Sequence, residues 1–273
     1  MTRRLILILF LFFSVTFSFA THVRGGEITY EHLSGLSYRF TIVTCNDPDG
    51  IDPDQTIKFD FGDGSPAVDA PLINGPFGSG FNEAIYQIDH TFNGDGSYIL
   101  SSSIENRNDD ILNITNSGDQ AACLESLLVI NSFARPYNNS VYFENSVCPE
   151  VACAGQEYCF NPLAVDPDGD SLVYSLTIPK GYISPGGTID DCADLPYSFP
   201  NIIGGGSITI DSNTGTICWD SPSVAGEFVF VVKVEEFFKG IRVGYVLRDI
   251  QLTIDATCTN SPPIIEPIPD TCV

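Results

Sequence analysis

An acidic turn that leads directly into an alternating segment, Asp166–Leu176, constrains the fold of this chain more than any other stretch. Its first part, Asp166–Asp170, alternates aspartate with proline and glycine, which are residues that favour turns. Apolar Leu172, Tyr174 and Leu176 then occupy every second position, and this period is typical of a half-buried β-strand. The pattern predicts strands that are joined by acidic turns.

A weaker version of the pattern occurs near the N-terminus, where the acidic turn 45–50 follows alternating Tyr38, Phe40 and Ile42. The chain has 24 Gly and 18 Pro and hardly any runs of strong helix formers, which agrees with strands and turns. We therefore expect an all-β fold. A mature length of about 250 residues fits two domains. We expect two tandem β-sandwiches, at 21–135 and 136–256.

The first twenty residues have the features of a secretory signal peptide, which is removed from the mature protein. Arg3 and Arg4 precede the apolar run Leu5–Phe19, and small residues precede the expected cut after Ala20. The alternative is a membrane anchor, but the run is shorter than the ~20 apolar residues that a spanning helix needs. We therefore expect cleavage of 1–20, and a protein that is secreted or at the cell surface with no membrane span.

The charge balance excludes two classes of partner. The net charge is −23, and loss of Arg3 and Arg4 with the leader lowers it by two further units. Nucleic acids and anionic membranes both require basic surfaces, so neither is an expected partner. An acidic chain can also be disordered, but 43% hydrophobic and 11% aromatic residues are enough to form packed cores.

Nine cysteines in an exported chain indicate disulfides rather than metal thiolates, and no pair has the C-x-x-C spacing of a zinc site. Cys45 and Cys123 lie in the first half and are candidates for a staple within it. The second half holds six more, which allow many pairings: Cys148, Cys153, Cys159, Cys192, Cys218 and Cys258. We favour Cys159 with Cys218, because both lie in strand-like segments beside large apolar residues. Cys272 is left as the odd cysteine.

Three motifs in the first half carry a resemblance to a known family. They are Phe59–Ser65, His90–Phe92 and Gly96–Leu100. This series resembles the polycystic-kidney-disease (PKD) repeat, whose hallmarks run W-D-F-G-D-G-S, H-T-Y and G-x-Y, with Phe59 in place of the usual Trp. The resemblance implies an immunoglobulin-like β-sandwich over 21–135 that serves as an extracellular spacer or interaction module.

A second resemblance covers 136–256. The acidic turn and strand at Asp166–Leu176, then Ile208–Asp211, Trp219 and Ala225–Phe228, look like a cadherin-like or dystroglycan-type immunoglobulin-like domain. This resemblance implies a second β-sandwich, in tandem with the first.

Some segments in both halves have weaker patterns. Ala121–Ile130 fits either a short helix or a buried strand, and we expect a strand that closes the first module. Lys239–Gly240 is expected to form a hairpin between two long strands. Pro179–Gly206 is rich in Pro and Gly and has no periodicity, so we expect a surface excursion.

Three further segments make the resemblance more specific: Thr21–Ile28, Val232–Glu236 and Arg248–Gln251. These segments are similar to the N-terminal region of large Bacteroidota surface proteins, often described as gliding-motility-associated or PKD-domain proteins. Such proteins usually carry further repeats and a C-terminal sorting domain for type IX secretion. The segment 257–273 looks like the start of a third repeat or a linker, so we expect this chain to be a piece of a longer protein or a short paralogue.

Asp166, Asp168 and Asp170 present carboxylate oxygens at alternate positions, which suits Ca²⁺. The spacing is not that of an EF-hand, because the twelfth position, Thr177, is not glutamate. Two interpretations remain open. One is a calcium site that stiffens the second module, and the other is a solvated acidic turn that keeps a strand edge soluble. Calcium is the one cofactor that the sequence indicates.

The residues needed for catalysis do not form a recognisable set. The three histidines are His22, His32 and His90, and none belongs to a nucleophile-elbow, zinc-protease or phosphate-loop motif. Pairs of carboxylates could serve a glycosidase, but 35 acidic residues produce such pairs by chance. Phe237 and Phe238 are candidates for a sugar or protein patch, or for hairpin packing. We therefore expect the protein not to be an enzyme.

Three functional classes follow. The expected one is a non-catalytic module outside the cell, used for adhesion or as a spacer, with proteins or polysaccharides at the cell surface as partners. The second is a carbohydrate-binding accessory region of a larger secreted enzyme. The third is an enzyme in its own right, which substitutions of the three aspartates in a hydrolase screen would reveal.

Overall fold

The computed structural model describes residues 23–47, 53–74, 82–105, 107–148, 151–184 and 186–258. The expected leader, Cys272 and most of the expected third repeat lie outside these residues. The described chain is nearly all β, with large antiparallel sheets and one short α-helix, α1 (Pro200–Gly204), which confirms the all-β prediction. None of the helices in this part of the chain is long and apolar enough to cross a membrane.

The first half forms one path of seven strands in the order β1-β2-β5-β4-β3-β6-β7. The strands are β1 (Val23–Ser34), β2 (Ser37–Asn46), β3 (Thr56–Asp60), β4 (Val68–Asn74), β5 (Asn82–Thr91), β6 (Gly96–Ile104) and β7 (Ala122–Ile130). In β2, Tyr38, Phe40 and Ile42 are buried while their neighbours are not, as the alternation predicts. The stretch that fits either a helix or a strand becomes β7, so the strand prediction is confirmed.

The second half is built around a long hairpin. Its strands are β8 (Tyr142–Phe143), β9 (Ala152–Cys153), β10 (Tyr158–Phe160), β11 (Ala164–Val165), β12 (Ser171–Thr177), β13 (Lys180–Gly181), β14 (Ala193–Asp194), β15 (Ser207–Ile210), β16 (Ile217–Asp220), β17 (Gly226–Phe238) and β18 (Ile241–Asp255). The turn at Lys239 and Gly240 joins β17 to β18, and both of its residues have positive φ. The hairpin prediction is therefore confirmed.

Each half has its own apolar core. The first core contains Phe40, Phe59 and Phe92 and draws its buried residues from positions 23–130. The second contains Trp219 and Phe228, whose rings meet edge to face at 5.0 Å, and draws its buried residues from 141–254. Beside the large sheet, the second half has a three-stranded sheet, β10-β16-β15, and the pair β8-β11. The two cores fall on either side of the expected boundary at 135.

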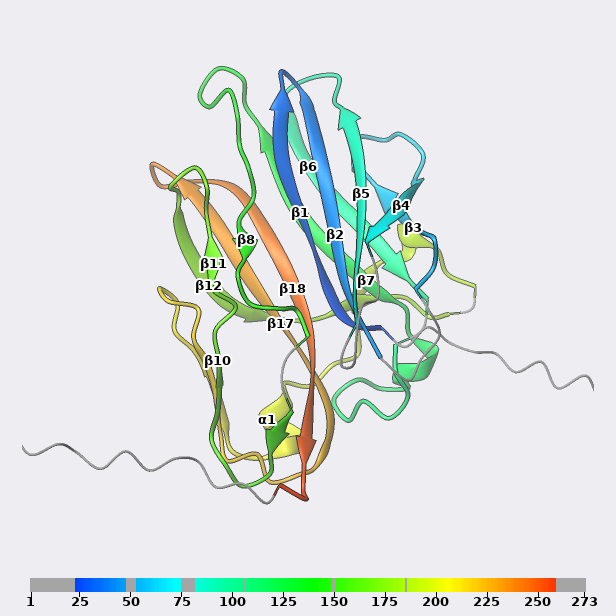
Figure 1. The fold of residues 1–273 in the computed structure, drawn as a ribbon, viewed down its shortest axis with the longest axis vertical. Coiled ribbons are helices and arrows are strands. Elements are labelled where there is room, and N and C mark those ends of the chain that lie inside the picture. The colour runs from blue at the N-terminus through cyan, green and yellow to red at the C-terminus, as the bar shows by residue number, and fades with distance from the viewer. Residues whose placement is uncertain are drawn as a thin grey trace, which may run out of the picture.

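The two halves nevertheless share one continuous sheet, because β18 pairs with both ends of the first path (Figure 1). Gly25 and Gly26 of β1 lie opposite Ile250 and Asp249. Further along β18, Tyr245 lies opposite Leu127 of β7. Strand β18 therefore closes the gap between β1 and β7 while its other edge pairs with β17. This sharing of a strand is not expected of two independent tandem sandwiches.

The disulfides also cross between the halves. Cys45 pairs with Cys148 and Cys123 pairs with Cys192, so the expectation that Cys45 and Cys123 staple the first half internally is wrong. The structure joins Cys159 to Cys218, the pairing that the sequence favoured, and Cys153 to Cys258. The expectation for Cys45 and Cys123 assumed that each half folds separately, whereas the shared sheet brings distant cysteines together.

The segment Pro179–Gly206 is a strap across the first half and not a free surface excursion. Lys180 pairs with Cys123 of β7, and the carbonyl of Tyr182 accepts the N–H of Ala121 at 2.8 Å. Its contacts with the first half combine backbone hydrogen bonds, the disulfide of Cys192, and the apolar packing of Tyr182 on Ala121 and of Leu195 on Ile111. Because these buried apolar residues are isolated and follow no period, the sequence pattern did not predict them.

Candidate functional site

The acidic loop Asp166–Asp170 connects β11 to β12 and folds around its own first carboxylate. Oδ1 of Asp166 accepts the backbone N–H groups of Asp168 (2.8 Å) and Asp170 (3.0 Å). Gly169 has a φ of 79°, where a side chain would be strained, and its N–H donates to the carbonyl of Asp166 (3.3 Å). The sequence therefore produces a tight turn that leaves the carboxylates of Asp168 and Asp170 available to other partners.

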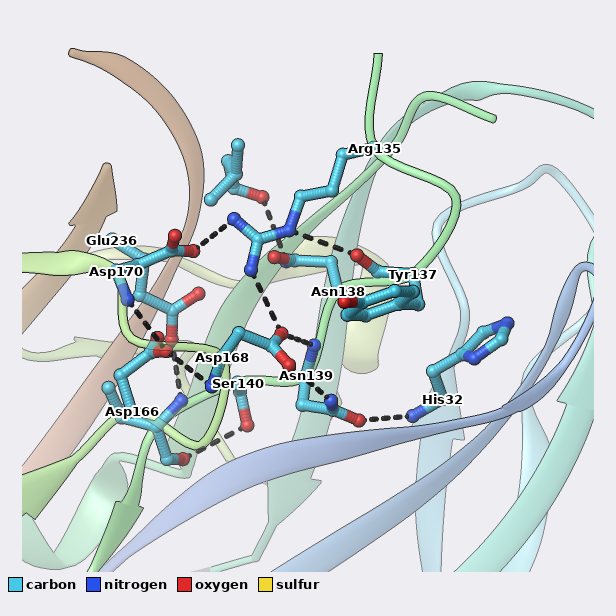
Figure 2. Close-up of polar contacts among 12 residues, drawn as sticks. His32, Arg135, Tyr137, Asn138, Asn139, Ser140, Asp166, Asp168, Asp170 and Glu236 are labelled. Atoms are coloured by element: carbon cyan, nitrogen blue, oxygen red, sulfur yellow. Dashed lines mark hydrogen bonds and ion pairs between the residues drawn. The ribbon is translucent and has the colours of Figure 1, made fainter. Parts of the chain in front are cut away.

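Arg135, from the segment between β7 and β8, supplies the positive charge at this loop (Figure 2). Its Nη2 lies 3.0 Å from Oδ2 of Asp168, and its Nη1 donates to Oδ2 of Asp170. Its Nε donates to the carbonyl of Tyr137 (2.9 Å), and the guanidinium lies 4.8 Å from the ring centre of Phe238. The side chains of Arg135, Asp168 and Asp170 are 9%, 7% and 3% exposed, so this cluster of ion pairs is almost buried.

Asn139 connects the cluster to the first half. Its backbone N–H and its Nδ2 both donate to the carboxylate of Asp168, at 2.7 and 2.9 Å. Its Oδ1 accepts the backbone N–H of His32 at the end of β1 (2.7 Å). The chain of contacts therefore runs from the second half through the linker to β1, as Figure 2 shows. Because hydrogen bonds to charged groups are strong, the cluster ties the acidic loop firmly to the end of β1.

The three aspartates of the calcium prediction lie in one loop, but Arg135 acts as the counter-ion of two of them. Burial raises the pKa of Asp166, and the charge of Asp170 adds to this rise while the backbone donors oppose it. Among the described residues, the group of side chains close enough to share an ion is Glu157 with Cys159 and Cys218, and these cysteines form a disulfide. Calcium binding by the acidic loop stays a prediction.

Glu236 of β17 lies beneath the loop and is completely buried, with 0% of its surface exposed. Its Oε1 accepts the backbone N–H of Val141 (2.7 Å), and its Oε2 lies 3.4 Å from the hydroxyl of Tyr30. Burial raises the pKa of Glu236 to about 8, and the nearby charges of Asp166 and Asp170 contribute, while the Val141 donor opposes the rise. The carboxyl is therefore protonated at neutral pH.

The hydroxyl of Tyr30 joins several buried groups. It accepts Nδ2 of Asn138 (3.1 Å), and its single proton is shared between two acceptors, the carbonyl of Leu127 (3.1 Å) and Oε2 of Glu236 (3.4 Å). Burial, with the charge of Glu236 next in size, raises the pKa of Tyr30 well above its usual value, so Tyr30 also stays neutral.

Two further ion pairs are buried where the halves meet. Nη2 of Arg107 lies 2.5 Å from Oδ2 of Asp249 on β18, and Arg107 is 1% exposed. Nε of Arg248 lies 3.1 Å from Oε2 of Glu27 on β1. Burial raises the pKa of Glu27 to about 7, although Arg248 opposes the rise. The sequence analysis identified none of these residues as a site.

His90 resembles a member of a catalytic triad only at first sight. Its Nε2 lies 2.8 Å from Oδ2 of Asp63, and Ser65 donates to Oδ1 of the same carboxylate (2.5 Å). In a triad the histidine stands between the serine and the carboxylate, whereas here the carboxylate stands in the middle, so nothing activates the serine. Burial opposes ionisation of Asp63, but the bonds from Ser65 and His90 lower its pKa to about 2. The cluster holds the turn after β3.

The arrangement at the loop can hold two halves together, but it offers substrate no free acid or base. The aspartates of the loop could be recognised from the sequence as site residues, but Arg135 and Glu236 could not be recognised in the same way. For Glu236 a signal was present, because the alternation that buries Val232 and Val234 also points position 236 toward the core. An acidic residue in that register indicates a buried carboxyl. For Arg135 no local signal exists, since its partners are 33 to 35 positions away.

Comparison with known proteins gives no family for this chain. The sequence matches no family model, and no curated protein shows significant similarity to it.

Proposed function

We propose that this chain is a non-catalytic module of the cell exterior that acts as a stiff spacer or adhesin between surface proteins or polysaccharides. In this proposal the two cores belong to a PKD-like and a cadherin-like sandwich of the immunoglobulin type, from a Bacteroidota surface protein of the gliding-motility-associated kind. Four disulfides fit an oxidising location outside the cytoplasm.

The observation that carries the proposal is the covalent framework. Cys45–Cys148 spans 103 residues and Cys153–Cys258 spans 105. The two loops follow each other along the chain and together enclose most of the fold. Within the described part of the chain, only the residues before Cys45 and the few between Cys148 and Cys153 lie outside both loops. A chain with this framework resists extension even when its sheets come apart.

The burial of Glu236 supports a non-catalytic role. A general acid with a raised pKa must touch its substrate, and Glu236 has no exposed surface. Its Oε2 accepts the hydroxyl of Tyr30 inside the protein. The carboxyl of Glu236 therefore contributes to the stability of the fold and not to catalysis.

Pulling experiments test the proposal directly. With handles placed just outside the fold, the oxidised chain should lengthen by no more than on the order of 100 Å, because only the segments outside the loops can extend. After reduction the same chain should lengthen by on the order of 800 Å. Release of several hundred ångströms without reductant would refute the stiff spacer. Hydrolysis of glycans or peptides that Glu236→Gln abolishes would refute the non-catalytic role.

A further inference from the structure

A groove of about 360 Å³ lies beside the acidic loop, between the outer face of β1 and β2 and the linker that leads into β8. Its base contains Thr29 and Glu31 of β1 and Thr41 of β2, and its wall contains Tyr142 and Pro167. The volume is at the lower end of the range for small-molecule sites, ~300–1,000 Å³. The groove has room for a small ligand or for one unit of a polymer.

The alternation of side chains along β1 places polar groups in this groove. Ile28 and Tyr30 point into the core, so Thr29 and Glu31 point outward. Thr29 lies directly opposite Thr41 in the β1–β2 register, which brings two hydroxyls side by side. Tyr142, on the opposite wall, is 48% exposed. The site therefore combines hydroxyls, one carboxylate and one open aromatic face.

These polar groups have hydrogen-bonding capacity left over. Within the described residues, the Glu31 carboxylate and the Tyr142 hydroxyl make no side-chain hydrogen bond or ion pair. The Thr29 hydroxyl has a single contact, 3.5 Å to the carbonyl of Thr41, which is at the limit of a hydrogen bond. No lysine, arginine or histidine is among the described residues that line the groove, and Arg39, which lies opposite Glu31 in the strand register, is paired with Asp89.

The wall of the groove is held in place without a ligand. The backbone N–H of Tyr30 donates to Oγ of Ser140 (2.8 Å), and the N–H of Ser140 donates to the carbonyl of Tyr30 (2.9 Å). The next residue, Val141, donates to the buried Glu236 (2.7 Å). Because these bonds fix the wall relative to β1, binding would lose little entropy in ordering the site.

We propose that this groove binds a neutral glycan. A sugar ring has an apolar C–H face that packs on the Tyr142 ring and hydroxyls that both donate and accept, which match Glu31 and Thr29. The net charge of −23 and the lack of a cation in the groove disfavour sulfated or uronic sugars. The inference rests on the proposed function, and it names the class of partner for an adhesive module.

The test begins with a glycan array probed by the full-length oxidised protein. The array carries neutral oligosaccharides of glucose, galactose, mannose and N-acetylglucosamine beside sulfated and uronate-containing ones. We expect binding to neutral glycans and weak or no binding to acidic ones. Titration calorimetry with the best neutral glycan should show affinity about tenfold lower for Tyr142→Ala, because the stacking face is lost. Glu31→Gln should reduce affinity severalfold.

Tyr137→Ala is the matched control, because Tyr137 lies in the same linker and is 52% exposed, close to the value for Tyr142. It should leave affinity unchanged, and all variants should retain the parent melting temperature. Preference for acidic glycans, an equal loss in Tyr137→Ala, or no neutral glycan bound at millimolar concentration would each overturn the groove assignment. The pulling experiment is independent of any ligand, so a failure of the groove and a failure of the stiff spacer are distinguishable.

Discussion

The core of the first half and the junction between the halves are both buried, but they are held in opposite ways. In the core, aromatic rings pack against one another, as Phe40 does with Phe59 at 5.3 Å between ring centres. At the junction, Arg107, Asp249 and Glu236 are as deeply buried, yet they are polar or charged. The core is stabilised by removal of apolar surface from water, and the junction by the pairing of groups that would be costly to bury alone.

This difference determines how each region fails. A core substitution leaves a cavity that neighbours partly fill, whereas removal of one junction partner leaves a charge buried and unpaired. The junction also specifies geometry, since each charge must meet one partner.

Arg107→Ala should destabilise the protein most among single junction changes, by about 3–5 kcal/mol in the free energy of unfolding, because Asp249 remains buried without a partner. Urea unfolding of the oxidised protein measures this. The double variant Arg107→Met, Asp249→Leu should recover most of the loss, since it leaves no buried charge. A double variant no better than the single one would show that the loss comes from packing.

Arg135→Ala should cost less, about 2–3 kcal/mol in the free energy of unfolding, because Asp168 keeps its two hydrogen bonds from Asn139 after the charge is lost. The same variant tests the calcium prediction. With Arg135 gone, millimolar Ca²⁺ should raise the melting temperature by more than it does in the parent protein, because the carboxylates repel each other. An equal response to Ca²⁺ and chelator in both proteins would remove the ion from the loop.

Glu236 should make stability depend on pH. Its pKa is about 8 in the fold against 4.5 in the reference state, so the unfolded chain loses its proton first. This contribution to stability is complete below pH 4.5 and declines by about 1.4 kcal/mol per pH unit until about pH 8.

Glu236→Gln keeps the shape and the hydrogen bond from Val141 but does not ionise. Its unfolding free energy should therefore fall less steeply than the parent's between pH 5 and pH 8. Glu27, with a pKa of about 7, contributes a similar slope to both proteins and cancels in the difference. Parallel pH profiles for the two proteins would contradict a protonated Glu236.

Arg39→Ala should have the smallest effect. Arg39 pairs with Asp89 at 2.8 Å, but both side chains are at least 40% exposed, so water and salt screen the pair. The melting temperature should change by less than about 2 °C. A larger shift would show that exposed pairs matter here as much as buried ones, and the contrast between core, junction and surface would be lost.

The sequence predicted those parts of the fold that depend on local periodicity. The alternation in β2 and β12 was visible because every second side chain, such as that of Phe40 or Tyr174, faces a core. In β17 the residues 228–232 are all buried, so its apolar content marks the strand as much as its alternation does. The turn at Lys239–Gly240 was visible because its backbone requires positive φ. These features are local, so a single sequence is enough to find them.

The junction could not be predicted in the same way. Arg107 meets Asp249 across 142 positions, and Cys45 meets Cys148 across 103. No period in the sequence records a contact of this kind, and composition alone cannot choose among nine cysteines. The acidic loop was found because its residues are adjacent, but its partner Arg135 was missed because it comes from another segment.

The pairing of β18 with both β1 and β7 limits how the gene for this protein can be divided and recombined over generations. A gene segment that ends near residue 135 would encode a first half whose β1 and β7 lack the strand that closes them. Duplication or exchange of the first half alone would therefore leave an open sheet edge. The unit that can be inherited intact is the pair of halves.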